Sequence, residues 1–115
     1  MRITIRSAKT LKEQKRGKSH IYQFNCRLKL RKDADRELLK TDIRAIKGVT
    51  IVTTVPQSEK TMGDFSHQVI SIKFQPYNVA PIEFVRNLSN SFRKLTLRGL
   101  TSFHFQPESL HKIKV

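Results

Sequence analysis

The residue types that most often carry catalysis are few in this chain, and their spacing fits no catalytic motif. Cys26 is the only cysteine, which excludes an internal disulfide and a metal site built from several thiolates. It lies mid-strand on an apolar side, where burial raises a thiol pKa and leaves the group unreactive. The histidines, which lack metal-ligand spacing, are His20, His67, His104 and His111. With no phosphate-binding glycine loop or nucleophile elbow, we expect no enzymatic activity and no cofactor.

Lysine and arginine are the side chains whose number points to a binding function. The chain of 115 residues has 23 of them against 9 acidic residues, a formal charge of +14. Residues 1–32 account for +10 of this charge and residues 33–115 for only +4. Clustered cations attract phosphates or acidic protein surfaces. The candidate residues for binding nucleic acid or an acidic partner are Lys9, Lys12, Lys15, Arg16, Lys18, Arg27, Lys29 and Arg31.

The first five of these candidates lie in a segment that cannot build a core. Residues 7–20 read SAKTLKEQKRGKSH, in which Leu11 is the only large apolar side chain. So little apolar surface cannot offset the entropy lost when the segment becomes ordered. We therefore expect residues 1–20 to form a mobile basic arm, with a short edge strand at Met1–Arg6. The alternative is a solvated linker that keeps the protein soluble.

The other three candidates alternate with apolar residues between Ile21 and Arg31. A period of two residues is typical of a strand that is buried on one side only. The pattern predicts a strand over 21–31 whose outer face presents Arg27, Lys29 and Arg31. The apolar side of this strand consists of Tyr22, Phe24, Cys26, Leu28 and Leu30.

Two helices and three further strands are expected along the rest of the chain. Acidic caps near Asp35, apolar residues at helical spacing and Gly48 predict a first helix of about 13 residues. A second helix begins at Pro81 and is stopped by Gly99. Polar residues 56–64 are expected to form a loop. Pro107 is expected to end the last strand, and the tail 107–115 to add an edge strand after it. The predicted strands are 49–55, 65–74 and 100–106.

The order β-α-β-β-α-β is typical of the ferredoxin-like split βαβ fold. We therefore expect an α+β domain over 21–106, with a four-stranded antiparallel sheet and two helices on one face. Because helical crossovers join parallel strands, the strand at 21–31 could also lie parallel to those at 65–74 and 100–106. As the central strand, it would place its three cations in the middle of the open face. The residues expected to join them there are His67, Lys73 and His104.

RNA-recognition domains share this fold, but two of their features are missing here. Tyr22 lies on the apolar side, whereas the corresponding aromatic of those domains faces RNA. The second aromatic motif of those domains is absent from residues 63–74. Seven of the nine aromatic residues fit the core, and only Phe65 and Tyr77 remain free. Any nucleic acid is therefore expected to be bound through its phosphates, with little sequence preference, and not by base stacking.

Two segments of the chain, followed by a helix and a closing strand, resemble small ferredoxin-like proteins of tailed bacteriophages. These segments are DIRAIKGVTIV from Asp42 and IKFQP from Ile72. The resemblance extends over residues 35–106 and is strongest for phages from aquatic sources. It implies a virion-associated or assembly component without catalysis. Because the shared pattern is one of packing, it assigns no functional residues.

Two functions remain open. The first is a structural or assembly module that docks on other protein subunits through strand edges, the open sheet face and the basic arm, as a homo-oligomer or in a phage virion. The second is a sequence-nonspecific binder of DNA or RNA phosphates. The chain has no apolar run of membrane length and no signal-peptide core at its start. We therefore expect no membrane partner, and a location in the host cytoplasm or the virion.

Overall fold

The computed structural model describes residues 20–113. The predicted arm, including the edge strand at Met1–Arg6, lies outside the described residues. The elements, in chain order, are β1 (Tyr22–Arg31), α2 (Arg36–Arg44), β2 (Val49–Thr54), β3 (Lys60–Met62), β4 (Phe65–Phe74), α3 (Pro81–Phe92), the 3-10 helix η2 (Arg93–Arg98) and β5 (Leu100–Lys112).

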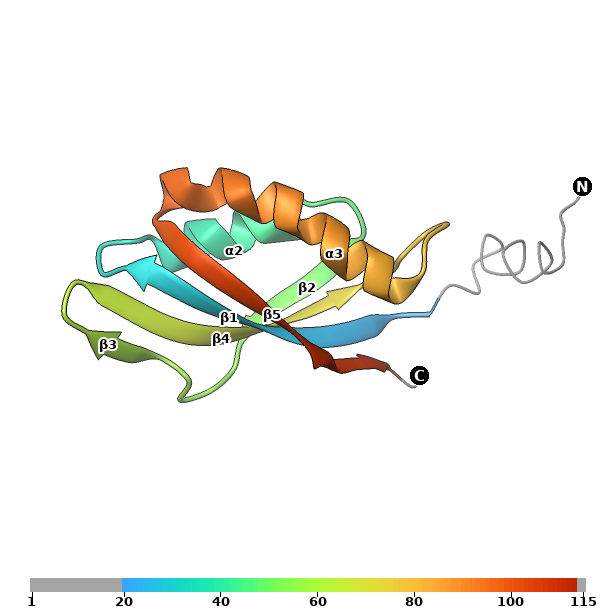
Figure 1. Ribbon diagram of the computed structural model, residues 1–115, viewed down its shortest axis with the longest axis horizontal. Coiled ribbons are helices and arrows are strands. Elements are labelled where there is room, and N and C mark those ends of the chain that lie inside the picture. The colour runs from blue at the N-terminus through green and yellow to red at the C-terminus, as the bar shows by residue number, and fades with distance from the viewer. Residues whose placement is uncertain (1–19, 114–115) are drawn as a thin grey trace, which may run out of the picture.

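One antiparallel sheet forms the base of the molecule. Its strands follow the order β2-β4-β1-β5, and β3 pairs with the remaining length of β4. Both α-helices lie on the same face of the sheet, and no described element covers the other face (Figure 1). The prediction of an α+β fold with an antiparallel sheet and two helices on one face is therefore confirmed. The arrangement is compatible with a ferredoxin-like fold.

The parallel pairing suggested for the strand at 21–31 is wrong. β1 runs antiparallel to both of its neighbours, β4 and β5. The strands that α2 connects, β1 and β2, do run in the same direction, because each is antiparallel to β4. However, β4 lies between them. The helical crossover therefore spans an inserted strand, and every hydrogen-bonded pair in the sheet is antiparallel.

The loop predicted at 56–64 contains a fifth strand. Lys60 and Met62 pair with His67 and Phe65 across a tight turn in which Gly63 has a φ of 62°. A positive φ is readily adopted by glycine, which has no Cβ to clash with the backbone. The sheet thus has five strands, where four were predicted, and β3 extends the edge of β4 beyond the end of β2.

Two element boundaries differ from their predictions. β5 does not end at Pro107 but continues to Lys112, which pairs with Tyr22. Proline is tolerated on an edge strand or in a bulge, where the ladder does not need its missing N–H. β5 is an edge strand, and residues 107–110 bulge out between the pairs Asn25–Gln106 and Gln23–His111. The first helix has 9 residues, where about 13 were predicted. The Asp35 side chain caps it by accepting a hydrogen bond from the Leu38 amide at 3.0 Å.

The core lies between the sheet and the two helices. The predicted inward residues of β1 from Phe24 to Leu30 are fully buried, and Tyr22 is half-buried with its ring stacked on Phe74, 5.9 Å between centroids. The α3 residues that pack onto them are Val85, Leu88 and Phe92. Since these contacts fix one face of β1, the alternate side chains of β1 must project from the opposite, open face.

Candidate functional site

The central position of β1 brings cationic side chains to the middle of the open face. Arg27 and Arg31 are exposed and Lys29 is half-buried, while the residues between them, Leu28 and Leu30, are fully buried. The predicted placement of the three cations on the open face is therefore confirmed. Their role in binding stays a prediction.

Register determines which residues of the neighbouring strands share this face. In an antiparallel sheet, directly opposite residues project to the same side. Lys29 lies opposite His67 of β4, and Arg27 lies opposite His104 of β5. Lys73 of β4 pairs with Gln23, which is also on the open side of β1. The expectation that His67, Lys73 and His104 join the cations of β1 is thus confirmed.

A fifth cation comes from β3, which the sequence analysis missed. Lys60 pairs with His67, so it belongs to the same face. The name basic face is used below for the open side of the sheet that carries Arg27, Lys29, Arg31, Lys60 and Lys73. None of the strand residues that pair on this face is an aspartate or a glutamate. The charged side chains among the paired residues of this face are therefore all basic.

The acidic residues with ion-pair partners lie mostly on the helical side of the molecule. Within residues 20–113, the lysine and arginine side chains of the helical layer form four ion pairs: Arg36–Glu59, Lys40–Glu37, Arg86–Glu83 and Arg98–Asp42. On the basic face only Arg31 forms one, with Asp33 at 3.6 Å. The remaining four cations of the basic face have no acidic partner among the described residues. Most ion pairs among the described residues thus involve cations of the helical layer, and only one involves a cation of the basic face.

Lys29 has a neutral partner on the basic face. Its ammonium nitrogen lies 4.4 Å from the centroid of the Phe65 ring. Phe65 is half-buried, so this cation–π contact holds Lys29 against the sheet without neutralising its charge. Lys29 therefore remains available to a second, anionic partner.

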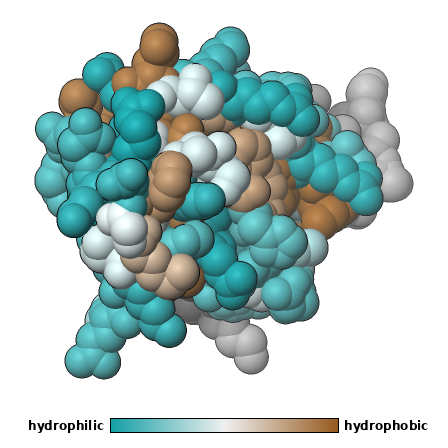
Figure 2. All heavy atoms as spheres, turned by 60° about the vertical axis from the view of Figure 1, so that its left-hand side comes forward, coloured by the Kyte–Doolittle hydropathy of each residue, from teal (hydrophilic) through white to brown (hydrophobic). Residues whose placement is uncertain are grey.

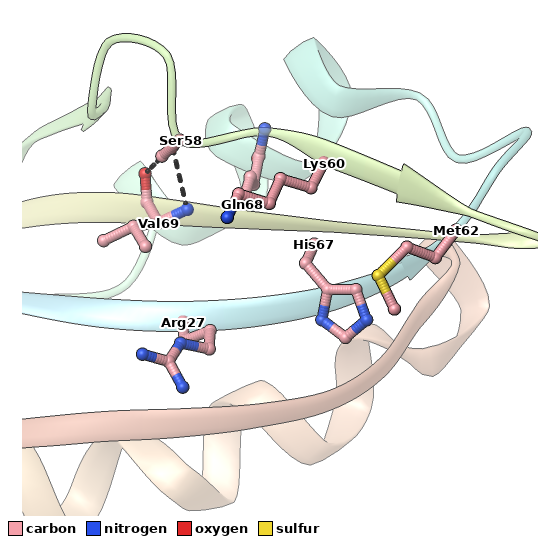
Figure 3. A pocket seen from close by; sticks show the side chains of 7 residues that line it. All are labelled: Arg27, Ser58, Lys60, Met62, His67, Gln68 and Val69. Atoms are coloured by element: carbon pink, nitrogen blue, oxygen red, sulfur yellow. Dashed lines mark hydrogen bonds between the residues drawn. The ribbon is translucent and has the colours of Figure 1, made fainter.

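A groove opens on the basic face where β3 curls beside β4. Its volume is about 420 Å³; Arg27 and Lys60 supply the cationic part of its lining, and His67 also lines it. Met62 and Val69 supply apolar surface between them. In Figure 3 the His67 ring and the Met62 thioether project to the same side of the sheet. The groove thus combines positive charge with a small apolar floor.

The surface around this end of the molecule is predominantly hydrophilic. Figure 2 shows apolar side chains in separate small groups between hydrophilic ones. Met62 is 62% exposed. Isolated exposed apolar residues are common in proteins, so the significance of Met62 depends on its position in the groove.

Glu59 fixes the segment that leads into β3. Its carboxylate accepts hydrogen bonds from Arg36 Nε at 3.1 Å, Ser66 Oγ at 3.0 Å and Gln68 Nε2 at 3.1 Å. The Arg36 guanidinium is the main reason that the pKa of Glu59 lies below its ordinary value, and burial opposes this shift. Because Arg36 begins α2 and the other two donors belong to β4, Glu59 connects the edge of the groove to the rest of the fold.

The cysteine and two of the histidines lie apart from one another in the fold. Cys26 is fully buried, and burial raises the pKa of its thiol to about 12, so the prediction of a buried thiol is confirmed. His67 and His104 lie on different neighbours of β1. Within residues 20–113 no three metal-ligating side chains come together, and no helix is both long and apolar enough to cross a membrane.

The structure describes only one of the two groups of predicted site residues. The candidates on β1 lie together on the basic face, whereas Lys9, Lys12, Lys15, Arg16 and Lys18 lie outside the described residues. The sequence analysis missed Lys60 and Met62, which reach the face through β3. The signal that could have found them is the short segment KTM before Gly63-Asp64, because a two-residue turn beginning with glycine is typical of a hairpin.

Comparisons with known proteins add no family to this description. Scans against protein-family models find no match to the chain, and searches of curated proteins and of solved structures find none either. The fold and the basic face therefore define the chain only as an α+β module with a positively charged open sheet.

Proposed function

We propose that this chain is a non-catalytic binding module of the ferredoxin-like split βαβ type that holds nucleic acid by its phosphates on the basic face. The observation that carries the proposal is the gathering of five lysine and arginine side chains on an uncovered sheet face, where none of the residues that pair across the strands is acidic. Cations that lack an acidic partner keep their full attraction for phosphates.

The division of charge between the layers supports this proposal over simple solubility. A chain that needed only solvation would be served by cations distributed on both layers. Within the described residues, four of the seven lysine and arginine side chains of α2, α3 and η2 form ion pairs, whereas only one of the five on the basic face does. The predicted arm, with Lys9, Lys12, Lys15, Arg16 and Lys18, would add a second group of phosphate contacts.

The salt dependence of binding tests the proposal. Each lost phosphate contact lowers the slope of log K against log salt concentration by about 0.7 for single strands and about 0.9 for duplex. The double variant Arg27→Gln/Lys73→Gln is therefore expected to lower the slope by about 1.4–1.8. Arg93→Gln/Lys94→Gln is the matched control, because both residues are exposed in η2 on the helical layer.

Fluorescence anisotropy with labelled DNA and RNA at several salt concentrations measures these slopes on the full chain. A third variant with the five arm cations replaced by glutamine measures the contribution of the arm. Absence of binding even at low salt contradicts the proposal. Equal effects of the face variant and the η2 control contradict the assignment of the site.

A second candidate is the structural or assembly function, for which β5 is the supporting observation. β5 has 13 residues and lies at one edge of the sheet, with only β1 beside it among the described strands. An unpaired strand edge is a template for pairing with another chain. On this proposal the chain joins other protein subunits, in a phage virion or in the host cytoplasm, as its resemblance to phage proteins suggests. Crosslinking of purified particles and size-exclusion chromatography test it, and a monomer never found in particles contradicts it.

A further inference from the structure

The groove beside β3 has a composition that phosphate binding alone does not explain. A site for phosphates needs cations, and Arg27 and Lys60 supply them. The floor, however, is apolar where Met62 and Val69 line it. Met62 is 62% exposed, so in the free protein its thioether faces water. A ligand that covers this floor gains from removing apolar surface from water as well as from the charge of the rim.

Duplex and single-stranded nucleic acids differ in what they offer to such a groove. A duplex presents phosphates and sugars outward and keeps the faces of its bases stacked inside. A single strand carries the same phosphates together with unpaired bases, whose flat faces pack on apolar and aromatic side chains. Only the single strand can use both the cationic rim and the apolar floor.

The size of the groove agrees with one nucleotide unit. Its volume of about 420 Å³ lies near the lower end of the range of about 300–1,000 Å³ found for small-molecule sites. A duplex is far too large to enter it, whereas one base with its sugar and phosphate is of suitable size. Phe65 lies next to the groove, opposite Met62 in the sheet, with Lys29 over its ring. A neighbouring nucleotide would meet a cation and an aromatic edge there.

We infer that the nucleic acid bound by the basic face is single-stranded, with one unpaired base seated against Met62 and Val69 and its phosphates on Arg27 and Lys60. This inference rests on the proposed function. It differs from the expectation that bases take no part in binding, because that expectation did not include β3 and Met62. Methionine suits such a place, since its flexible and polarizable side chain adapts to ligands of different shape. Base packing of this kind tolerates different sequences.

Competition binding with the full chain tests the inference. The probes are oligo-dT, oligo-U, a DNA duplex of equal charge, an abasic strand of equal length and polyglutamate. Both single strands are expected to bind at least fivefold more tightly than the duplex and the abasic strand. The variant Met62→Gln is expected to weaken single-strand binding about two- to tenfold and to leave duplex binding unchanged, as loss of one sulfur–aromatic contact predicts. Leu97→Gln is the control, because Leu97 is 89% exposed in η2 on the other layer.

The outcomes separate the inference from the proposed function. If duplex and single strands bind equally, the inference fails and phosphate binding stands. The same conclusion follows if Met62→Gln has no effect while Arg27→Gln weakens the binding of both duplex and single strands. Equal binding of the abasic strand or of polyglutamate also overturns the inference, because the base then contributes nothing. If no nucleic acid binds at low salt, both proposals fail.

Discussion

Gly99 provides the most direct test of how the fold holds the end of the basic face. Its φ is 94°, and a Cβ at this position would lie 2.6 Å from the Ala34 Cβ. The Gly99 carbonyl accepts a hydrogen bond from the Arg31 amide at 2.8 Å, and the Ala34 amide donates to the Arg31 carbonyl at 3.0 Å. We therefore expect Gly99→Ala to disturb the backbone on both sides of Arg31.

The free energy of unfolding that Gly99→Ala is expected to remove has two parts. A side chain in the left-handed region costs about 1–2 kcal/mol. The contact with Ala34 adds about 1–3 kcal/mol, the typical cost of overpacking, because carbon atoms prefer about 3.5–4.0 Å and the clash involves a short, rigid side chain. We expect Gly99→Ala to lower the free energy of unfolding by about 2–5 kcal/mol. Gly63→Ala is the matched control with φ of 62° and no atom within 4 Å of the added Cβ, so only the first part applies.

Urea unfolding followed by circular dichroism measures these free energies. A double-mutant cycle with Ala34→Gly isolates the contact, since removing the Ala34 Cβ relieves the clash in the Gly99→Ala background. The expected coupling free energy is about 1–3 kcal/mol in favour of the double variant. A coupling within about 0.5 kcal/mol of zero, the normal error of additivity, refutes the close packing of these two residues. Equal destabilisation by Gly99→Ala and Gly63→Ala refutes it independently.

Two further predictions concern titratable groups. Burial raises the pKa of the Cys26 thiol to about 12. At mildly alkaline pH this thiol is therefore expected to resist a disulfide reagent in the native protein and to react rapidly in denaturant. A rapid reaction in the native protein contradicts the burial of Cys26. The lowered pKa of Glu59 stabilises the fold above the ordinary carboxyl pKa of about 4.3, and this contribution disappears as pH falls through the folded-state pKa. Glu59→Gln is therefore expected to be less stable than the parent chain at neutral pH, with a difference that shrinks in acid unfolding series. A pH-independent difference contradicts the Arg36 contact.

The sequence predicted well those features that depend on local periodicity. The alternation at 65–74 gives β4 the predicted bounds, and the alternation around Cys26 assigns each residue of β1 to its correct face. Features that depend on partners distant in the chain were missed. β3 has only three residues and exists because it pairs with β4. β5 passes Pro107 because β1 extends far enough to pair with Lys112.

The same distinction applies to the candidate site. Arg27, Lys29 and Arg31 were identified because they share a strand, and a period of two places them on one face. Lys60 and Met62 could not be found in this way, since their presence on the face depends on the register of β3 against β4. The groove is therefore a tertiary feature, although the positive charge around it is largely a local one.

The basic face opposes the stability of the sheet that carries it. Arg27, Lys29 and Arg31 are alternate residues of β1 on the same face, roughly 7 Å apart along the strand, and like charges at this spacing repel one another. Packing on the reverse side offsets this repulsion, because Phe24, Leu28 and Ile72 are fully buried beneath the helices. A sheet selected only for stability would place threonine or glutamate at some of the outer positions. The proposed anionic ligand would neutralise these cations when it binds and so remove their mutual repulsion.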